Sequence, residues 1–345
     1  INNPSQIHGV MTGSGDDLFE LSNIDSNHHA VIINQLDAGA GTNTLNVKDS
    51  IFKAQADTKF ENFANIHLDK TALTLVASNN IATGTVHIDQ LSALTLGDQY
   101  TGDFSASVVG DGTVTIDKGA TVTLTGTNTG LTGNLTVAAG GTLNTNHLNQ
   151  FGSGTTEVAG TLNHTANSLQ THLTGAGQLN LTGDQSAFNF DDNVGSDFTG
   201  NVRLQNNTFN LSGTNTKTLA NSTLSLSSGN TTTVEGQNQA VKNLELDGAT
   251  LVFKDVGSIV TNHLSNTIQD SVIQVDVTDT ESVNVIDQNS GVGKQLITAK
   301  TTAINLDHVA LQDLAGQAMG AGTELEIKQN GHAVADGTYH YALKE

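Results

Sequence analysis

The sequence predicts an all-β protein built as a parallel β-helix, and two observations support this prediction. The first is a series of short segments that alternate apolar residues with Thr or Asn, the period of a strand with one buried face. The second is the return of these segments every 20–23 residues, a period typical of solenoids. No segment is long enough to form a stable sheet alone, so the segments must stack on one another.

The clearest segments lie between Gly110 and Asn144, in the stretch GDGTVTIDKGATVTLTGTNTGLTGNLTVAAGGTLN. Glycine-rich or asparagine-rich corners separate them, as tight turns require. The expected strands are Thr113–Ile116, Thr121–Leu124, Asn134–Val137 and Thr142–Leu143.

Two tracks of apolar positions define the expected coils. Steps of 21, 23, 21, 23, 22 and 20 residues separate the members of the first track, which we expect to stack in one buried column: Val114, Leu135, Val158, Leu179, Val202, Leu224 and Leu244. The second track follows it: Val122, Leu143, Leu162, Phe188, Phe209, Val234 and Leu251. The segments lack both helical spacing and the leucine-rich-repeat frame, which favours a β-helix.

Composition limits the partners that such a solenoid can have. The net charge of the 345-residue chain is -21, and only 13 residues are Lys or Arg. A surface that follows phosphates needs clustered basic residues, so nucleic acid and anionic membranes are poor partners. The chain has no cysteine, which excludes disulfides and thiolate metal sites.

The N-terminal region contains two glycine-rich stretches, TGSGDDLFEL and DAGAGTNTLNV, that approach the calcium-binding nonapeptide of β-rolls. Asp16 and Asp17 are the candidate metal ligands of the first stretch, whereas Asn43 replaces the acid in the second. Because calcium needs six or more oxygen ligands, we expect plain glycine-rich corners and no metal or cofactor.

Further along the chain, one corner recurs as YTGDF, LTGNL and FTGNV, starting at Tyr100, Leu131 and Phe198. From about residue 276 the composition changes, with Val, Ile, Lys, Asp and Gln replacing Thr. A solenoid needs an atypical unit over its last coil. We therefore expect a β-helix shaft over residues 1–275 and a C-terminal cap with antiparallel character over residues 276–345.

These corners, together with GAGTNTL, FENFANIHL and the ending GTYHYAL, resemble the passenger domains of Gram-negative autotransporter adhesins of the self-associating and diffuse-adherence type. The resemblance implies a right-handed, three-faced β-helix that is exported to the cell surface and can be released from it. It also implies an outer-membrane barrel in the full-length precursor and an autochaperone-like role for the last 70 or so residues.

No set of residues in the sequence indicates catalysis. TGSGDD and FGSGTT fit neither a serine protease motif nor the G-x-S-x-G elbow. Neighbours on a strand point to opposite faces, so the adjacent acids Asp191 and Asp192 would not converge. The 12 histidines show no H-x-x-x-H or H-E-x-x-H spacing. The protein is therefore not expected to be an enzyme, and a β-helix polysaccharide lyase or glycosidase remains the alternative.

The remaining hypothesis is a surface adhesin that acts in cell aggregation, biofilm formation or attachment through a polar face of the β-helix. Its expected partners are copies of itself on neighbouring cells, or host glycosaminoglycans and matrix proteins, with no nucleic acid. The candidate binding residues are those of polar corners and loops: Asn128, Asn144, Asn163, Asp191, Asp192, Asn193, Asn206, Asn230, Lys118, Lys217 and Lys242.

Overall fold

The fold is taken from a computed structural model of the chain. The structure describes residue 1 and residues 6–29, 31–78, 80–81, 84–182, 188–204, 208–211, 217–227, 229–254, 257–268, 272–276, 282–290, 293–300, 324–329 and 332–333. These residues form a β-solenoid of parallel stacked coils, which confirms the predicted fold class. Two short 3-10 turns are the only helical elements among them.

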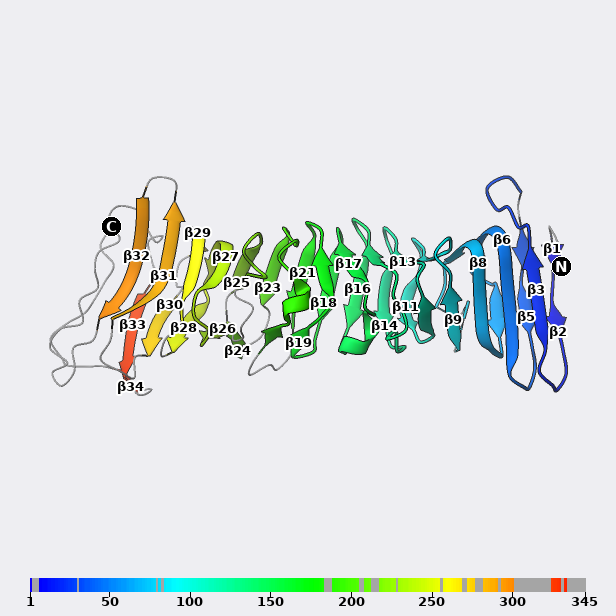
Figure 1. Ribbon diagram of the computed structural model, residues 1–345, viewed down its shortest axis with the longest axis horizontal. Helices are drawn as coiled ribbons and strands as arrows, with labels where there is room; N and C mark the ends of the chain where they lie inside the picture. The colour runs from blue at the N-terminus through cyan, green and yellow to red at the C-terminus, as the bar shows by residue number, and fades with distance from the viewer. Residues whose placement is uncertain are drawn as a thin grey trace. The chain divides into compact units, whose positions relative to one another are not determined.

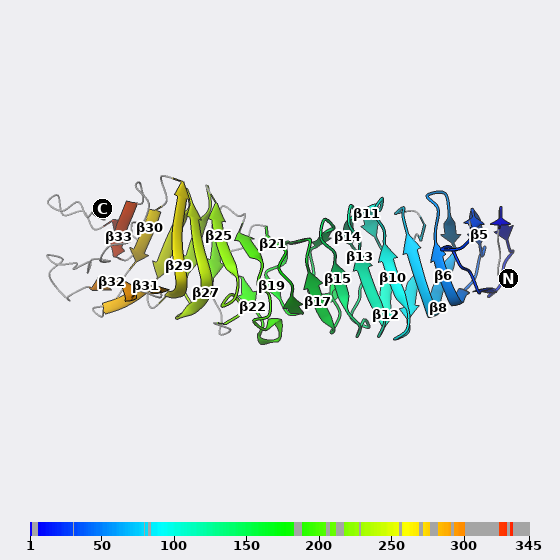
Figure 2. The same cartoon turned by 90° about the horizontal axis from the view of Figure 1, so that it is seen from above.

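The chain divides into two compact units. The first comprises Ile1–His164 and Thr171–Gly177, and the second comprises Thr165–Gln170 and Gln178–Glu345. Figure 1 and Figure 2 show how, within each unit, successive strands lie side by side.

The first unit is made of parallel sheets in which each strand pairs with the equivalent strand of the next coil. One sheet contains β3 (Leu18–Ser22), β6 (Asn43–Lys53), β8 (Phe63–Leu75), β9 (Thr85–Ile88), β10 (Ala93–Leu96), β12 (Ser107–Gly110), β13 (Thr113–Ile116), β15 (Leu135–Val137), β17 (Thr155–Val158) and β20 (His172–Thr174). A second contains β11 (Thr101–Phe104), β14 (Thr121–Leu124), β16 (Thr142–Thr145) and β18 (Thr161–His164). Smaller sheets join β2 (Val10–Met11), β5 (Gln35–Asp37) and β7 (Lys59–Glu61), and β1 (Gln6–Ile7) with β4 (Ile32–Ile33); η1 is the turn Leu148–Gln150.

The second unit repeats this arrangement with two main sheets. One contains β21 (Gln178–Leu181), β23 (Asn201–Leu204), β25 (Thr223–Ser227), β27 (Gln239–Asp247), β29 (Ile259–Ile268), β31 (Ser282–Ser290) and β32 (Gly293–Lys300). The other contains β24 (Thr208–Leu211), β26 (Thr231–Val234), β28 (Thr250–Lys254), β30 (Val272–Asp276), β33 (Glu324–Gln329) and β34 (His332–Ala333). The pair β19 (Ser168–Leu169) and β22 (Asn189–Phe190) and the 3-10 turn η2 (Asp192–Val194) complete the described elements.

The core of the first unit consists of apolar columns that run from coil to coil. In one column, in-register partners bring together Leu75, Leu96, Ile116, Val137 and Val158. All five are buried, whereas the residues between them along each strand point outward. Full burial of one such side chain stabilises the fold by about 1.5–3 kcal/mol, so the columns hold the coils together.

The predicted single column is wrong in its register, although all seven of its members are buried. Val158 is the partner of Val137 rather than Leu135. Leu179 lies in the sheet of β21 and β23, a different sheet from that of Val158. The reason is a short coil: Thr156 pairs with Leu173, a step of 17 residues. Apolar positions chosen at steps of 20–23 residues therefore fall in different sheets on the two sides of this short coil.

The second predicted track also changes sheet. Val122, Leu143 and Leu162 are in-register partners, as expected. Phe188 lies outside the named strands and forms an isolated bridge to Leu211. The last three members belong to the sheet of β24, β26 and β28, where Val234 pairs with Leu211, and where Phe209 and Leu251 both pair with Thr232. Coil length is not constant at the N-terminus either, because Leu18 pairs with Thr44, a step of 26 residues.

Several corner glycines are needed because coils approach one another closely. A Cβ atom added at Gly133 would collide with the carbonyl oxygen of Gly112, and one added at Gly154 would collide with that of Gly133. Neither Gly133 nor Gly154 has a positive φ, so the requirement comes from stacking and not from turn geometry. These three residues form a column at one corner, one per coil.

The C-terminal region has the antiparallel character that its composition predicts. β31 pairs with β32 and β33 with β34, both antiparallel, whereas β30 pairs with β33 in parallel. The cap and autochaperone roles of residues 276–345 remain predictions.

Candidate functional site

The outward side of the sheet β11–β14–β16–β18 carries two parallel rows of small polar side chains. Strand alternation points every second residue away from the core, and the parallel register places equivalent residues of successive coils opposite one another. One row is Thr101, Thr121, Thr142 and Thr161, and the other is Asp103, Thr123, Asn144 and Asn163. We call these eight residues the Thr/Asn face.

Hydrogen bonds run along the second row of this face. Asn163 donates from Nδ2 to Oδ1 of Asn144 over 2.7 Å, and Asn144 donates from Nδ2 to Oγ1 of Thr123 over 3.4 Å. Each bond joins one coil to the next, so the amides are held in a fixed orientation. All eight side chains are exposed or half-buried. The result is an ordered array of hydroxyl and amide groups.

The Thr/Asn face carries little charge. Asp103 is its only ionisable member. Lys118 is exposed in the turn between β13 and β14, just before Thr121, and the backbone N–H of Lys118 donates to Oδ1 of Asp117 over 2.8 Å. Lys118 is also the only Lys or Arg in the sequence between Lys70 and Arg203. An anionic partner would therefore find one cation beside this face.

Asn144 and Asn163 were predicted as binding residues of corners, and the structure corrects their position. Both lie within strands, β16 and β18, and point outward. The structure brings these two predicted residues together, and the predicted Lys118 lies in the turn just before the same face.

Asn128 and Asn230 were also predicted to bind ligands, and this prediction is wrong because both are buried. Asn128 is 2% exposed; its Oδ1 accepts from the N–H of Val108, and its Nδ2 donates to the carbonyl of Gln150. Asn230 is 7% exposed and donates to the carbonyl of Leu204. Their amides point inward and satisfy backbone groups at corners, where a buried unpaired N–H or C=O would be costly.

The remaining candidates lie in the second unit. Asp191 is the N-cap of η2, and its carboxylate accepts from the N–H of Asn193 over 3.0 Å. Asp192 and Asn193 are exposed, as are Lys217 and Lys242. Asn206 lies outside the described residues.

The two glycine-rich N-terminal stretches stack on each other as corners. Asp16 accepts a 2.7 Å hydrogen bond from the backbone N–H of Thr42, and the N–H of Asp17 donates to Oδ1 of Asn43. Asn43 is fully buried and donates to the carbonyls of Gly39 and Asn62. No group of three or more His, Cys, Asp or Glu in the described part of the chain is arranged to hold a metal ion.

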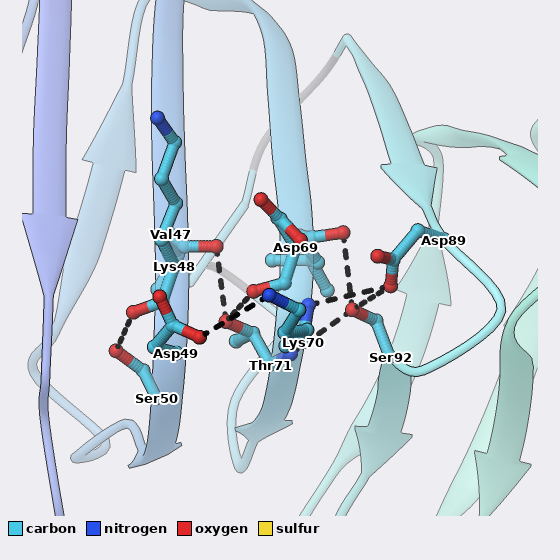
Figure 3. A network of polar contacts seen from close by, with 10 residues as sticks. Val47, Lys48, Asp49, Ser50, Asp69, Lys70, Thr71, Asp89 and Ser92 are labelled. Carbon is cyan, nitrogen blue, oxygen red and sulfur yellow. Dashed lines mark hydrogen bonds and ion pairs between the residues drawn. The ribbon is translucent and has the colours of Figure 1, made fainter.

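A polar corner that the sequence analysis missed lies where β6 and β8 bend. Asn23, Asp49 and Lys70 each have a positive φ of 45–57°. Behind them, buried hydroxyls join the coils, as Figure 3 shows: Thr71 donates toward the carbonyl of Val47 over 3.0 Å, and its N–H donates to Oγ of Ser92. Ser50, Thr71 and Ser92 recur at 21 residues, a hydroxyl period that could have revealed the corner.

Charged groups cover the outside of this bend. Lys48 pairs with Glu20 at 3.0 Å, and Lys70 lies 3.9 Å from Asp49. The hydrogen bond and charge of Glu20 raise the pKa of Lys48 above its ordinary value. Next to them, the rings of His67 and His87 stack on neighbouring strands. Burial, and then the charge of His67, lower the pKa of His87.

Comparisons with known proteins give two relatives of undetermined function. No family model matches the chain, and no solved structure matches it significantly. The uncharacterized lipoprotein YdeK of Escherichia coli K12 is 25% identical over 198 residues, which cover 48% of this chain and 15% of that protein. The uncharacterized protein YuaQ of the same strain is 25% identical over 266 residues, which cover 68% of this chain and 19% of that protein.

The chain thus spans less than a fifth of the length of either relative. In the described part of the chain, no helix has the length and hydrophobicity that crossing a bilayer requires.

Proposed function

We propose that this chain is part of a cell-surface adhesin whose Thr/Asn face makes the adhesive contact. The observation that supports this proposal is the ordered ladder Thr123–Asn144–Asn163 on an outward sheet face. The expected activity is cell aggregation, biofilm formation or attachment.

Repetition is what makes such a face useful for adhesion. One hydrogen bond between solvated polar groups contributes only about 0.5–1.5 kcal/mol net. Rigid rows with one residue per coil allow several such bonds to form in register, and many copies on one cell add avidity without any new contact. Because the ladder already fixes the amides of Asn144 and Asn163, less side-chain entropy is lost on binding.

The charge distribution supports one of the expected partners over the others. A glycosaminoglycan is polyanionic, whereas the face has one acid, Asp103, and one neighbouring cation, Lys118. We therefore favour a copy of the same protein, or another weakly charged polar surface. The net charge of -21 repels two copies at long range. Physiological salt reduces the range of this repulsion to about 8 Å, so salt should promote aggregation.

A location at the cell envelope is part of the same proposal. The name of YdeK describes a lipoprotein, which agrees with display at a membrane. The autotransporter type of export, and release from the surface, rest on the sequence resemblance alone.

The test replaces three outward residues of the face in a surface-displayed protein: Thr123→Ala, Asn144→Ala and Asn163→Ala together. The matched control is Thr95→Ala, Thr115→Ala and Thr136→Ala, three outward residues in register on β10, β13 and β15. Cell aggregation and binding to matrix proteins and glycans are measured against ionic strength, and thermal unfolding of both purified variants confirms that they fold.

We expect the face variant to lose most aggregation and the control to retain it. Equal behaviour of the two variants would contradict a role for the Thr/Asn face. Binding that salt weakens, and that Lys118→Ala abolishes, would instead indicate an anionic glycan. Turnover of a polysaccharide would favour the enzyme alternative.

A further inference from the structure

His67 on β8 and His87 on β9 occupy the same register position on neighbouring parallel strands. Both side chains are half-buried on the outward side of the sheet. Their ring centroids are 4.2 Å apart, and the ring planes differ by 5°. The two imidazoles therefore form a face-to-face pair that is open to solvent.

Asn65 fixes the protonation of one ring. Its Oδ1 lies 3.3 Å from Nε2 of His87. An amide oxygen has no proton to donate, so Nε2 of His87 must be the donor in this contact. In the neutral ring the lone pair is then on Nδ1. A histidine that donates one ring N–H to an oxygen and presents the other nitrogen is arranged as metal-binding histidines usually are.

The surroundings of the pair carry more acids than bases. In the same register row, Asn46 is the neighbour of His67 and Val109 is the neighbour of His87. Asp69 lies two residues after His67, and alternation places it on the outward side. Asp89 lies two residues after His87 and accepts from the hydroxyl of Ser92. The nearby cation Lys48 is already paired with Glu20.

We propose that His67 and His87 together bind one divalent transition-metal ion of borderline softness, such as Cu²⁺, Ni²⁺ or Zn²⁺, with water in the remaining positions. Metal–nitrogen distances of 2.0–2.1 Å in a tetrahedral site place two ligand nitrogens about 3.4 Å apart. The nitrogen lone pairs lie in the ring planes, which are parallel in the stack. To bind one ion, each half-exposed ring must therefore turn out of the stack by about 55°, half the tetrahedral angle, so that the two nitrogens converge.

The proposal predicts an order of affinities. Sites with imidazole ligands follow Ni²⁺ < Cu²⁺ > Zn²⁺, whereas Ca²⁺ and Mg²⁺ prefer oxygen ligands. We expect Cu²⁺ to bind most tightly and Ca²⁺ not to compete. Competition by Ca²⁺ would indicate binding to the surface carboxylates and would overturn the assignment to the histidines.

The test titrates the full chain with Cu²⁺ by calorimetry and by NMR, in which the paramagnetic ion broadens resonances close to it. We expect His67→Gln and His87→Gln each to weaken binding at least tenfold, and the double variant to behave like either single one. His172→Gln is the control, because His172 is a half-exposed histidine on another strand, β20. Thermal unfolding without metal confirms that each variant folds.

A second variant tests the site by improving it. Asn65→Asp would replace the amide oxygen by a carboxylate, which raises the basicity of a ligating imidazole. We expect tighter Cu²⁺ binding by about tenfold. The proposal is overturned if Cu²⁺ broadens His172 as much as His67 and His87, or if the single histidine variants bind Cu²⁺ as the unmodified chain does.

Discussion

Asn163 donates a 2.7 Å hydrogen bond to Asn144, the residue that occupies its position one coil earlier. The bond runs along the solenoid axis and links β16 to β18 outside the backbone ladder. It thus contributes to two properties at once, the cohesion of the coils and the order of the Thr/Asn face. The first property can be measured without knowing the partner.

We expect Asn144 and Asn163 to be energetically coupled. In a double-mutant cycle with Asn144→Ala and Asn163→Ala, the coupling should be about 0.5–1.5 kcal/mol, because the cycle isolates one amide–amide hydrogen bond. Urea unfolding of the four proteins measures it. Strictly additive free energies would show that the bond does not hold the coils together.

Asn128 should matter for stability far more than an exposed asparagine. Asn128→Ala removes the partners of the Val108 N–H and the Gln150 carbonyl, both buried at a corner. We expect a loss of about 2–4 kcal/mol in the free energy of unfolding. The control is Asn193→Ala at an exposed position, for which we expect a change within about 0.5 kcal/mol. Similar losses in both variants would contradict the structural role of Asn128.

The corner glycine Gly133 should not tolerate even a methyl group. Its Cβ would collide with the carbonyl oxygen of Gly112 in the coil before, so neighbouring coils would have to separate. We expect Gly133→Ala to lose more than about 3 kcal/mol or to prevent folding. Gly13→Ala is the matched control, because nothing lies within 4 Å of its added Cβ. Circular dichroism and thermal unfolding distinguish the two, and equal stability would contradict the close stacking.

The buried hydroxyl of Thr71 should stabilise the bend in β8. Thr71→Val keeps the shape but leaves the carbonyls of Val47 and Asp69 without this donor. We expect a loss of about 1–3 kcal/mol in urea unfolding. The same substitution at the outward Thr136 should change stability by no more than about 0.5 kcal/mol. If the two valine variants unfold alike, the hydroxyl ladder of Figure 3 is not a stabilising feature.

The carboxyl of Asp37 should titrate below its ordinary value. It accepts first from the N–H of Gly39 over 2.9 Å and then from Nδ2 of Asn62 over 2.6 Å, and both bonds lower its pKa below 3.8. These two bonds therefore stabilise the folded state above pH 3.8, and their contribution is lost as the pH falls through the lowered pKa of Asp37.

Asn62→Gly tests the second of these bonds and keeps the positive φ of 61° at that position. We expect the pKa of Asp37, followed by NMR, to rise toward 3.8 and to remain below it, because the bond from Gly39 persists. An unchanged pKa would show that the Asn62 amide does not reach the carboxylate in solution.

The sequence predicted the inside and the outside of most strands correctly. In Thr113–Ile116 and Thr121–Leu124 the apolar residues are buried and the threonines point outward. This works because the side-chain period of a strand is two, so a local pattern is enough to show which face is buried. The expectation that the coils stack in parallel is also confirmed. Each segment is too short to form a stable sheet alone, so it pairs with the equivalent segment of the next coil.

The side of the coil to which a strand belongs could not be read in the same way. The apparent step from Val158 to Leu179 joins two different sheets, because the coil between them is short. The alternation of buried and exposed residues is the same in every sheet of the solenoid. The sequence pattern therefore does not show to which sheet a strand belongs. Only the backbone hydrogen bonds between paired strands determine the sheet to which each strand belongs.

The sequence alone determined that this protein is a parallel β-solenoid with Thr and Asn on its surface, because alternation and repeat are properties of the chain itself. Only the tertiary structure decided what each asparagine does. Asn144 and Asn128 are similar in sequence context, yet one points outward from a strand and the other inward at a corner. The direction depends on how the backbone turns between coils and on which N–H and C=O groups that turn leaves without a partner.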